Sequence, residues 1–397
     1  MFERPPAVSH TGAPTKALLV ALDFGAIDYA ESKSELDLLV SGAGLQVLGM
    51  VEGKRSRPDS ALYAGSGKVQ EIAKLREEME ADLVIFNHEL SPAQQRNLER
   101  ELDCRVIDRT SLILDIFAQR AKSHEGKVQV ELAQLEHLAT RLVRGWSHLE
   151  RQKGGIGLRG PGETQLETDR RLLGDRVKNL KAQLQKLQRQ RDVQRRARMR
   201  GKVLSVSLVG YTNAGKSTLF NALTHAGAYA ADKLFATLDT TTRRLYLPEV
   251  GNITISDTVG FIRELPTTLV AAFRATLEET VHADLLLHVV DSSSAVRDAQ
   301  IAQVNKVLQD IGAQDIPQIL VWNKIDLSGL EPGEDRDEYA KIARVRLSAR
   351  TGQGLEFLRQ ALVEVAAARL PGAATNGDAT DPDSPSTIQN TQSSSIA

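Results

Sequence analysis

Residues 203–218 read VLSVSLVGYTNAGKST. The run from Val203 to Val209 has the apolar pattern of a buried strand, and Gly210 to Ser217 matches the pattern G-x-x-x-x-G-K-[ST] in full. A glycine-rich loop that opens a helix presents backbone N–H groups and the positive end of the helix dipole to a phosphate. We therefore predict a strand, a phosphate-binding loop and a helix, in that order.

The residues of this loop have different expected roles. Gly210 and Gly215 permit a close approach of the phosphates, Lys216 reaches the β- and γ-phosphates, and the Ser217 hydroxyl binds Mg²⁺. The nucleotide contacts expected from this segment come from Gly210, Tyr211, Thr212, Asn213, Ala214, Gly215, Lys216, Ser217 and Thr218.

A second motif, D-x-x-G, follows the β-like run Ile253 to Ser256. We expect Asp257 to hold Mg²⁺ through a water molecule and Gly260 to present its N–H to the γ-phosphate. Between the two motifs, Thr237 is expected to offer its hydroxyl to Mg²⁺ and to order its loop only with a triphosphate. The alternative is that the threonines here are ordinary turn and strand residues.

Residues 323–326 read NKID and follow the apolar strand 318–322. The carboxylate of Asp326 can accept two hydrogen bonds, and guanine presents two adjacent donors where adenine has no such pair. The expected contacts in this part of the site come from Asn323, Lys324, Asp326, Ser348 and Ala349. Asn323 is expected to tie this loop to the phosphate loop, and the Ala349 N–H is expected to reach the guanine O6. This spacing predicts a site for GTP and GDP. An ATPase or kinase with a phosphate loop is the alternative, and Asp326 argues against it.

The composition of the chain is that of a water-soluble protein with two or three domains. It has 397 residues, a net charge of −1 and a single cysteine, Cys104, so no disulfide can form within it. Its longest apolar runs are too short for a membrane span or a secretory signal. We expect a cytoplasmic protein whose contacts with nucleic acid come from a local basic cluster.

The pattern along the chain predicts an α/β fold of five segments. Residues 1–16 are expected to be a flexible terminus, and residues 17–126 alternate strands and helices, which indicates a parallel sheet covered by helices. Residues 202–371 form the nucleotide-binding domain, a mostly parallel sheet with helices on both faces. Residues 372–397 are poor in apolar side chains and are expected to be disordered.

Residues 127–201 predict two long amphipathic helices, which can bury their apolar seams as an antiparallel hairpin or against a neighbouring domain. The seams are Leu132, Leu135, Ala139, Leu142 and Trp146, and Leu173, Val177, Leu180, Leu184 and Leu187. Residues 170–202 carry thirteen Lys or Arg against two acids. That excess indicates either a surface for a phosphate backbone or an ordinary solvated helix face.

The segment between the two helices is the most distinctive in the chain. Residues 154–167 read GGIGLRGPGETQLE, which resembles the signature of the HflX family of GTPases, and the turn Gly65-Ser66-Gly67-Lys68 also matches. The resemblance covers nearly all of the chain. It departs at the carboxyl end, where some members carry a further small domain and this chain has only the low-complexity tail.

The resemblance implies that the hairpin tip enters the large ribosomal subunit near the peptidyl-transferase region, with Arg151, Lys153 and Arg159 on ribosomal RNA. It also implies that the protein splits or rescues stalled ribosomes under stress. Some members bind ATP near the position of Gly65, where this chain has a turn that could hold an anion weakly or could be a tight turn that contacts an RNA backbone. A GTP-regulated RNA-binding scaffold with incidental catalysis is the alternative function.

The residues expected to support hydrolysis are Lys216, Thr237, Gly260 and Asn213. Ras-like enzymes carry a water-orienting glutamine after D-x-x-G, and this chain has Phe261 there. A phenyl ring cannot hold a water by hydrogen bonding, so we expect slow intrinsic hydrolysis that a partner accelerates. Asn213 either supports a K⁺ ion that stabilises the transition state or only shapes the loop.

Overall fold

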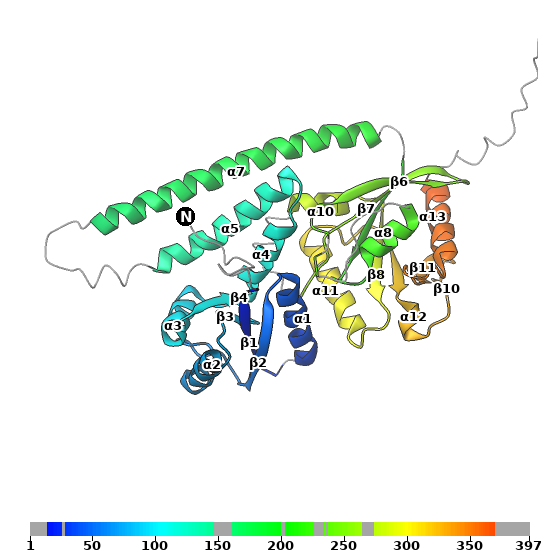
Figure 1. Cartoon of the computed structure of the whole chain (residues 1–397). Coiled ribbons are helices and arrows are strands. Elements are labelled where there is room, and N and C mark those ends of the chain that lie inside the picture. Colours follow the sequence, from blue (N-terminus) through cyan, green and yellow to red (C-terminus); the bar gives the residue numbers. More distant parts are fainter. Residues whose placement is uncertain are drawn as a thin grey trace, which may run out of the picture.

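Four parallel strands form the first of two sheets in the order β2-β1-β3-β4 (Figure 1). The computed structural model describes residues 14–25, 28–145, 161–199, 203–224, 234–235, 237–263 and 274–369. The elements of the first domain are β1 (Lys16–Asp23), α1 (Tyr29–Gly42), β2 (Gln46–Lys54), α2 (Ser66–Glu78), β3 (Leu83–Phe86), α3 (Pro92–Leu102), β4 (Arg105–Asp108) and α4 (Arg109–Arg120). The predicted alternation of strands and helices is confirmed.

The apolar run of β1 supplies side chains to both faces of this sheet. Leu18 and Val20 belong to the core beneath α2 and α3, while Ala17 and Leu19 belong to the core beneath α1 and α4. Because successive side chains of a strand point to opposite faces, a strand covered on both sides must be apolar throughout. Helix α3 begins with Ser91 in a capping box and a proline in the first turn.

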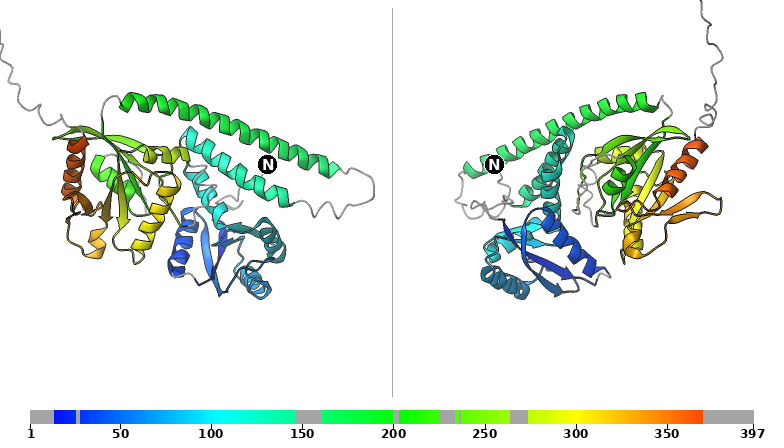
Figure 2. Two further views of the ribbon diagram at one scale, coloured as in Figure 1. Left: turned by 180° about the vertical axis from the view of Figure 1, so that it is seen from behind. Right: turned by 45° about the vertical axis from the view of Figure 1, so that its right-hand side comes forward.

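The helical hairpin consists of α5 (His124–Gly145) and α7 (Pro161–Met199), which lie side by side in every view (Figures 1 and 2). Leu132 of α5 packs with Leu180 and Leu184 of α7 in a small apolar cluster. The other face of α5 contributes Val130 and Ala133 to the core of the first domain. The apolar residues of α5 therefore pack both against the second helix of the hairpin and against a neighbouring domain, which are the two arrangements that the sequence allowed. Leu142 and Trp146 lie outside the residues whose side chains the structure describes.

Among the residues that the structure describes, the second sheet has seven strands in the order β10-β11-β9-β8-β5-β7-β6, and only its two edge pairings are antiparallel. Its strands are β5 (Ser205–Gly210), β6 (Thr241–Leu247), β7 (Gly251–Asp257), β8 (Leu285–Asp291), β9 (Gln318–Asn323), β10 (Gly333–Arg336) and β11 (Ile342–Arg346). The helices are α8 (Lys216–Thr224), α10 (Arg274–Val281), α11 (Arg297–Asp310), α12 (Ile325–Ser328) and α13 (Leu355–Arg369). The predicted mostly parallel sheet is confirmed, although the sequence pattern did not reveal the edge strands β6 and β10.

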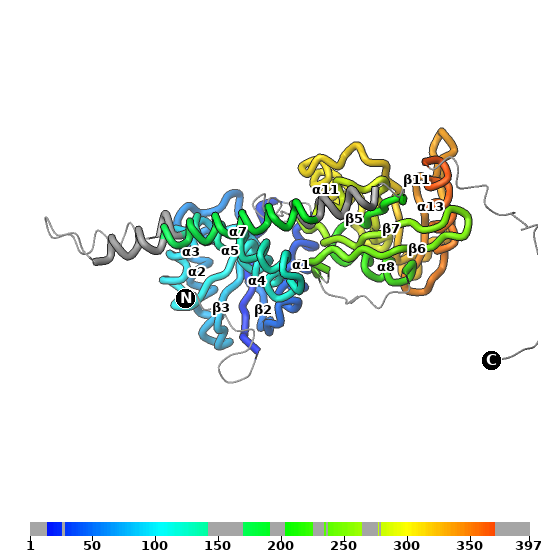
Figure 3. Tube along the Cα trace, turned by 90° about the horizontal axis from the view of Figure 1, so that it is seen from above, coloured from blue at the N-terminus to red at the C-terminus, as the bar shows by residue number. Residues whose placement is uncertain are grey.

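One apolar cluster runs through both domains. It joins residues beneath α1 and α4 of the first domain to residues of α10 and α11 in the second. Seen from above, the hairpin lies across the first domain (Figure 3). The two sheets therefore share part of their core.

The described ends of the chain differ a little from expectation. Strand β1 begins at Lys16, which falls inside the range 1–16 that we expected to be flexible. Residues 1–13 and the tail at 372–397 lie outside the described residues. Among the helices that the structure describes, none has the length and apolar character needed to cross a bilayer.

A buried histidine in the central strand β8 makes the stability of the second domain depend on pH. Burial lowers the pKa of His288 to about 4, and its Nδ1 has no hydrogen-bond partner among the described residues. As pH falls below about 6.5, the unfolded chain gains a proton at this position that the folded chain does not accept until about pH 4. We expect this group to cost the folded state roughly 3 kcal/mol across that window.

The measurement is the urea midpoint of unfolding between pH 7 and pH 4.5, followed by circular dichroism, for the native chain and for His288→Leu. The variant should show a shallower loss of stability with falling pH. Parallel curves for the two proteins would contradict the assignment.

Candidate nucleotide site

The phosphate loop leaves the carboxyl end of β5, and α8 begins at Lys216, as the motif predicts. Gly210 has a φ of +146°, and a Cβ there would lie 2.2 Å from the Val289 carbonyl oxygen. Gly215 has a φ of +92°, and a Cβ there would lie 2.2 Å from Nδ2 of Asn323. Both positions require glycine, because the backbone conformation and the space each exclude a side chain.

Lys216 is buried within the loop that it serves. Its Nζ donates to the carbonyl oxygens of Gly210 at 3.1 Å and Tyr211 at 2.7 Å. Burial lowers its pKa to about 8, since the ammonium group has lost its hydration, and the nearby carboxylate of Asp257 opposes that shift. A cation held in this way is short of negative charge, which the phosphates of a nucleotide can supply.

Three oxygen atoms from separate motifs meet beside the loop. The hydroxyl of Thr237 lies 2.7 Å from the Ser217 hydroxyl and donates to Oδ2 of Asp257 at 2.9 Å, and Ser217 donates to the same Oδ2 at 2.7 Å. Asp257 is 1% exposed, and its Oδ1 has no hydrogen-bond partner among the described residues. Burial raises the pKa of this carboxyl. Hydroxyl and carboxylate oxygens with a free buried acceptor fit a hard divalent cation such as Mg²⁺.

Gly260 lies against the phosphate loop. A Cβ at this position would be 2.9 Å from the Cα of Thr212 and 3.0 Å from Nζ of Lys216. The next residue, Phe261, is 1% exposed, and its backbone bonds to Gly210 and Thr212. Its ring belongs to the core shared by both domains. Phe261 therefore anchors the backbone beside the loop and presents no group to a reacting water.

Asn323 connects the phosphate loop to the two base-recognition motifs. Its Nδ2 donates to the Ala214 carbonyl oxygen at 2.9 Å, and its Oδ1 accepts from the Ala349 N–H at 2.9 Å. The tie to the phosphate loop agrees with the role that we expected for Asn323. The Ala349 N–H, which we expected to face a guanine O6, is directed at the Asn323 side chain in this arrangement.

A cavity of about 430 Å³ lies between these motifs and holds the residues expected to bind the base. Asp326 is exposed within it, and Lys324 pairs with Asp291 at 2.7 Å. Lys324 has a φ of 64°, a left-handed conformation that turns the chain from β9 into α12. The cavity is lined by Asn213, Gly215, Thr218, Asn323, Lys324, Asp326, Leu327, Ser348, Ala349 and Arg350.

Two residues in or beside this site, Arg350 and Asp291, escaped sequence reasoning. Arg350 follows the Ser348-Ala349 pair and lines the cavity, and Asp291 ends β8 beside the Lys324 ammonium group. The position of Asp291 at the carboxyl end of a predicted strand was the available signal, because ligands of open α/β sheets bind at that edge.

The first domain reaches the phosphate loop through a buried polar cluster that the sequence did not reveal. The Tyr211 hydroxyl donates to Oε1 of Glu35 at 2.6 Å, and Arg109 pairs with Oε2 of the same carboxylate at 2.5 Å. Arg109 also donates to Asn87 at 2.9 Å. Glu35 and Arg109 are 6% and 3% exposed, so their charges are withdrawn from water and must satisfy each other.

Arg263, shortly after the D-x-x-G motif, joins the same cluster. Its backbone N–H donates to the Tyr211 hydroxyl at 2.9 Å, and its guanidinium group pairs with Asp28 of the first domain. The phosphate loop and the segment after the D-x-x-G motif are thus both fixed to the first domain. Burial, and then Glu35, raise the pKa of Tyr211, so its hydroxyl stays protonated as a donor.

The residues predicted to contact RNA, Arg151, Lys153 and Arg159, lie outside the described residues. On the adjoining helix, Arg176 pairs with Glu131 and Lys181 pairs with Glu136 across the hairpin. The charges of these two basic residues are paired within the hairpin, which leaves a smaller positive excess for a partner.

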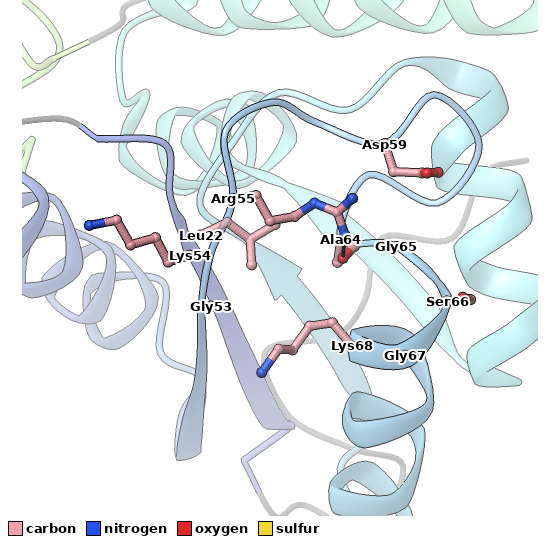
Figure 4. A pocket seen from close by; sticks show the side chains of 10 residues that line it. All are labelled: Leu22, Gly53, Lys54, Arg55, Asp59, Ala64, Gly65, Ser66, Gly67 and Lys68. Atoms are coloured by element: carbon pink, nitrogen blue, oxygen red, sulfur yellow. Dashed lines mark hydrogen bonds between the residues drawn. The ribbon is translucent and has the colours of Figure 1, made fainter.

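The turn at Gly65 lines a separate pocket of about 480 Å³ in the first domain (Figure 4). Arg55 donates to the Ala64 carbonyl oxygen at 2.6 Å, and a Cβ at Gly65 would lie 2.1 Å from the Arg55 guanidinium group. Lys68 pairs with Glu71 at 2.7 Å. These contacts favour a tight turn built from protein groups over an anion site.

Three family models match consecutive parts of the chain. A GTP-binding GTPase N-terminal model covers residues 30–118, and a GTP-binding GTPase middle-region model covers residues 120–198. A model described as 50S ribosome-binding GTPase covers residues 205–324. The order of the three models follows the first domain, the hairpin and the nucleotide-binding domain.

Named relatives extend over nearly the same length. The GTPase HflX of Escherichia coli strain K12 is 57% identical over 353 residues, which are 89% of this chain and 83% of that protein. The GTPase HflX of Caldanaerobacter subterraneus is 49% identical over 348 residues, 87% of this chain and 79% of that protein. A GTP-binding protein from Sulfolobus solfataricus, solved with GDP, aligns over 89% of this chain and 99% of its own, at 25% identity and a TM-score of 0.46. The chain belongs to the HflX family of GTPases.

Proposed function

We propose that this protein is a GTP-hydrolysing switch that binds the large ribosomal subunit and splits or rescues stalled ribosomes under stress. The model matched by residues 205–324 describes a 50S ribosome-binding GTPase, which supports the ribosomal partner and a cytoplasmic location. One observation carries the switch: Thr237, on a separate loop, reaches Ser217 and Asp257 within hydrogen-bond distance. A loop that closes on the phosphate site can report which nucleotide is bound.

Mg²⁺ would be held by Ser217 and Thr237 directly and by Asp257 through water. The free Oδ1 of Asp257 is the acceptor that such a water needs. Bound there, Mg²⁺ would neutralise charge on the phosphates of the nucleotide. Lys216 would transfer its hydrogen bonds from loop carbonyl oxygens to phosphate oxygens, and Gly260 would give its N–H to the γ-phosphate.

The residue at position 261 has no polar group that could orient an attacking water. Phe261 stands where Ras-like enzymes carry glutamine. Its ring is buried in the shared core and has no group that could hold a water by hydrogen bonding. We propose slow intrinsic hydrolysis that the ribosome accelerates. The hairpin tip with Arg151, Lys153 and Arg159 would contact ribosomal RNA, and the remaining basic surface of α7 would extend that contact.

The first prediction from the proposed function concerns acceleration of hydrolysis by the ribosome. Adding ribosomes or isolated large subunits should raise GTP turnover by about 10³-fold or more, because an external group would supply the positioning and charge that Phe261 cannot. The measurement is phosphate release under saturating GTP with and without subunits, alongside sedimentation in GTP, GDP and no nucleotide. Equal turnover with and without ribosomes would refute the proposed partner role.

The second prediction concerns selection of the base. Asp326→Asn should lower affinity for GTP by roughly 10-fold to 100-fold, because a charge-assisted pair of hydrogen bonds to guanine is lost. The same variant should gain affinity for XTP, since xanthine carries an acceptor where guanine carries the 2-amino donor. Competition binding of GTP, XTP and ATP measures the change. An unaltered base preference would contradict the role of Asp326.

The third prediction separates the two interpretations of Asn213. This residue has a φ of 60°, which glycine adopts without strain, so Asn213→Gly preserves the loop and removes only the amide. If the amide supports a K⁺ ion, replacement of K⁺ by Na⁺ should slow hydrolysis in the native chain and have no effect in the variant. A variant that retains both the native rate and its response to K⁺ would show that Asn213 only shapes the loop.

A further inference from the structure

The loop that carries Thr237 is seated on the first domain. Phe235 meets Phe117 of α4 edge to face, with ring centroids 4.6 Å apart and an interplanar angle of 77°. Leu234 and Leu238 are each at most 4% exposed and belong to the core that includes α1 and α4. We call the described residues 234–235 and 237–239 the switch segment. Its apolar side chains face the first domain, while Thr237 faces the phosphate loop.

The last residue of the switch segment caps the first helix of the hairpin. Oδ2 of Asp239 accepts the backbone N–H groups of Lys122 and Ser123, each at 2.8 Å, and Oδ1 accepts the Ser123 hydroxyl. The Ser123 Oγ in turn accepts the N–H of Gly126 at 2.8 Å. These donors lie at the amino end of α5, where a negative charge is also favoured by the helix dipole.

Gly126 leaves the space in which the Asp239 carboxylate lies. A Cβ at Gly126 would be 2.2 Å from Oδ1 of Asp239 and 3.1 Å from the Ser123 Oγ. Its backbone is ordinary helix, where alanine is intrinsically more favourable than glycine. The absence of a side chain at Gly126 is therefore explained by the space that the Asp239 carboxylate occupies. By contrast, a Cβ at Gly174 of α7 would meet nothing within 4 Å.

We propose that Asp239 is a positioning residue for GTP binding and hydrolysis. The Asp239 carboxylate lies in the space that Gly126 leaves open, and this contact keeps Thr237 beside Ser217 and Asp257. The proposal rests on the proposed function, because it takes Thr237 to be the residue that responds to the triphosphate. It also gives the hairpin a direct contact with that residue's loop.

Covalent geometry makes this coupling short. Two residues span at most about 7 Å, so Thr237 and Asp239 cannot move far apart. Leu238 between them is 3% exposed and fixed in the shared core. Ligand contacts that keep Thr237 at the phosphate loop therefore favour the contact of Asp239 with the amino end of α5. By thermodynamic reciprocity, a force that tilts α5 changes the affinity for GTP.

The experiment compares Asp239→Asn, Gly126→Ala and the matched control Gly174→Ala. The first two disturb the same contact from opposite sides, and the control adds the same methyl group to the hairpin in open space. The readouts are affinity for a non-hydrolysable GTP analogue with Mg²⁺, affinity for GDP, and hydrogen exchange of the amides at residues 122–126. Melting curves without nucleotide show whether each variant is folded.

Asp239→Asn and Gly126→Ala should each weaken binding of the analogue by about 10-fold relative to GDP, as expected for loss of a charge-assisted contact. In the native chain the analogue should slow exchange at residues 122–126 more than GDP does, and both variants should lose that difference. The double variant should be no weaker than either single one, because both remove one contact. Gly174→Ala should match the native chain.

An unchanged preference for the analogue over GDP in both variants, or exchange at residues 122–126 that ignores the nucleotide, would overturn the proposal. Thr237→Ala distinguishes the two levels of the argument. If Thr237→Ala weakens analogue binding while the Asp239 and Gly126 variants do not, only the positioning role fails. If Thr237→Ala has no effect either, the proposed switch itself fails. If one of the two variants, Asp239→Asn or Gly126→Ala, is unfolded without nucleotide, the result with the other variant tests the proposal, because it disturbs the same contact from the opposite side.

Discussion

The nucleotide site depends on the close approach of Gly215 to Asn323. The Asn323 amide occupies the space that a side chain at position 215 would need, and from there it bonds to Ala214 and to the Ala349 N–H. A single buried side chain thus sets the distance between the phosphate loop, the end of β9 and the segment after β11. Because the phosphates and the base of one nucleotide have a fixed separation, that distance decides whether all the motifs can contact it together.

A second constraint comes from the first domain. The Arg109–Glu35 ion pair is almost fully withdrawn from water, and such a pair offsets its desolvation cost only when its remaining groups are satisfied. Tyr211 bonds to Glu35 and Asn87 bonds to Arg109, while Nε of Arg109 has no hydrogen-bond partner among the described residues. Separating the two domains would remove the Tyr211 hydroxyl from Glu35, break the pair between Arg263 and Asp28, and expose apolar side chains of the shared core on both surfaces. The first domain is therefore a structural component of the phosphate site, and its position bears on the geometry of the loop.

The sequence predicted those parts of the molecule that local rules determine. The strands β1, β3, β5 and β8 are predominantly apolar runs, and the Ser91 cap and the glycines of the phosphate loop follow from requirements of a few neighbouring residues. The short polar strand β10 has no such signal, since it is defined by its pairing with β11. The same limit applies to Glu35 and Asp239, whose partners lie far away in the sequence. Neither a period nor a motif connects Asp239 to Ser123 at a distance of more than one hundred residues.

The balance of forces on the switch segment follows from these contacts. Thr237 is held at the phosphate loop by hydrogen bonds to Ser217 and Asp257, and a nucleotide with Mg²⁺ would add contacts that depend on the ligand. Leu234, Phe235 and Leu238 are held by apolar burial, which does not depend on the ligand. Loss of the γ-phosphate would remove the added contacts and leave the apolar ones. A segment retained by its apolar contacts and by the cap on α5 would open only partly, and reorientation of the hairpin would be needed to release it fully. A body that holds the hairpin could then control the state of the nucleotide site without touching the nucleotide.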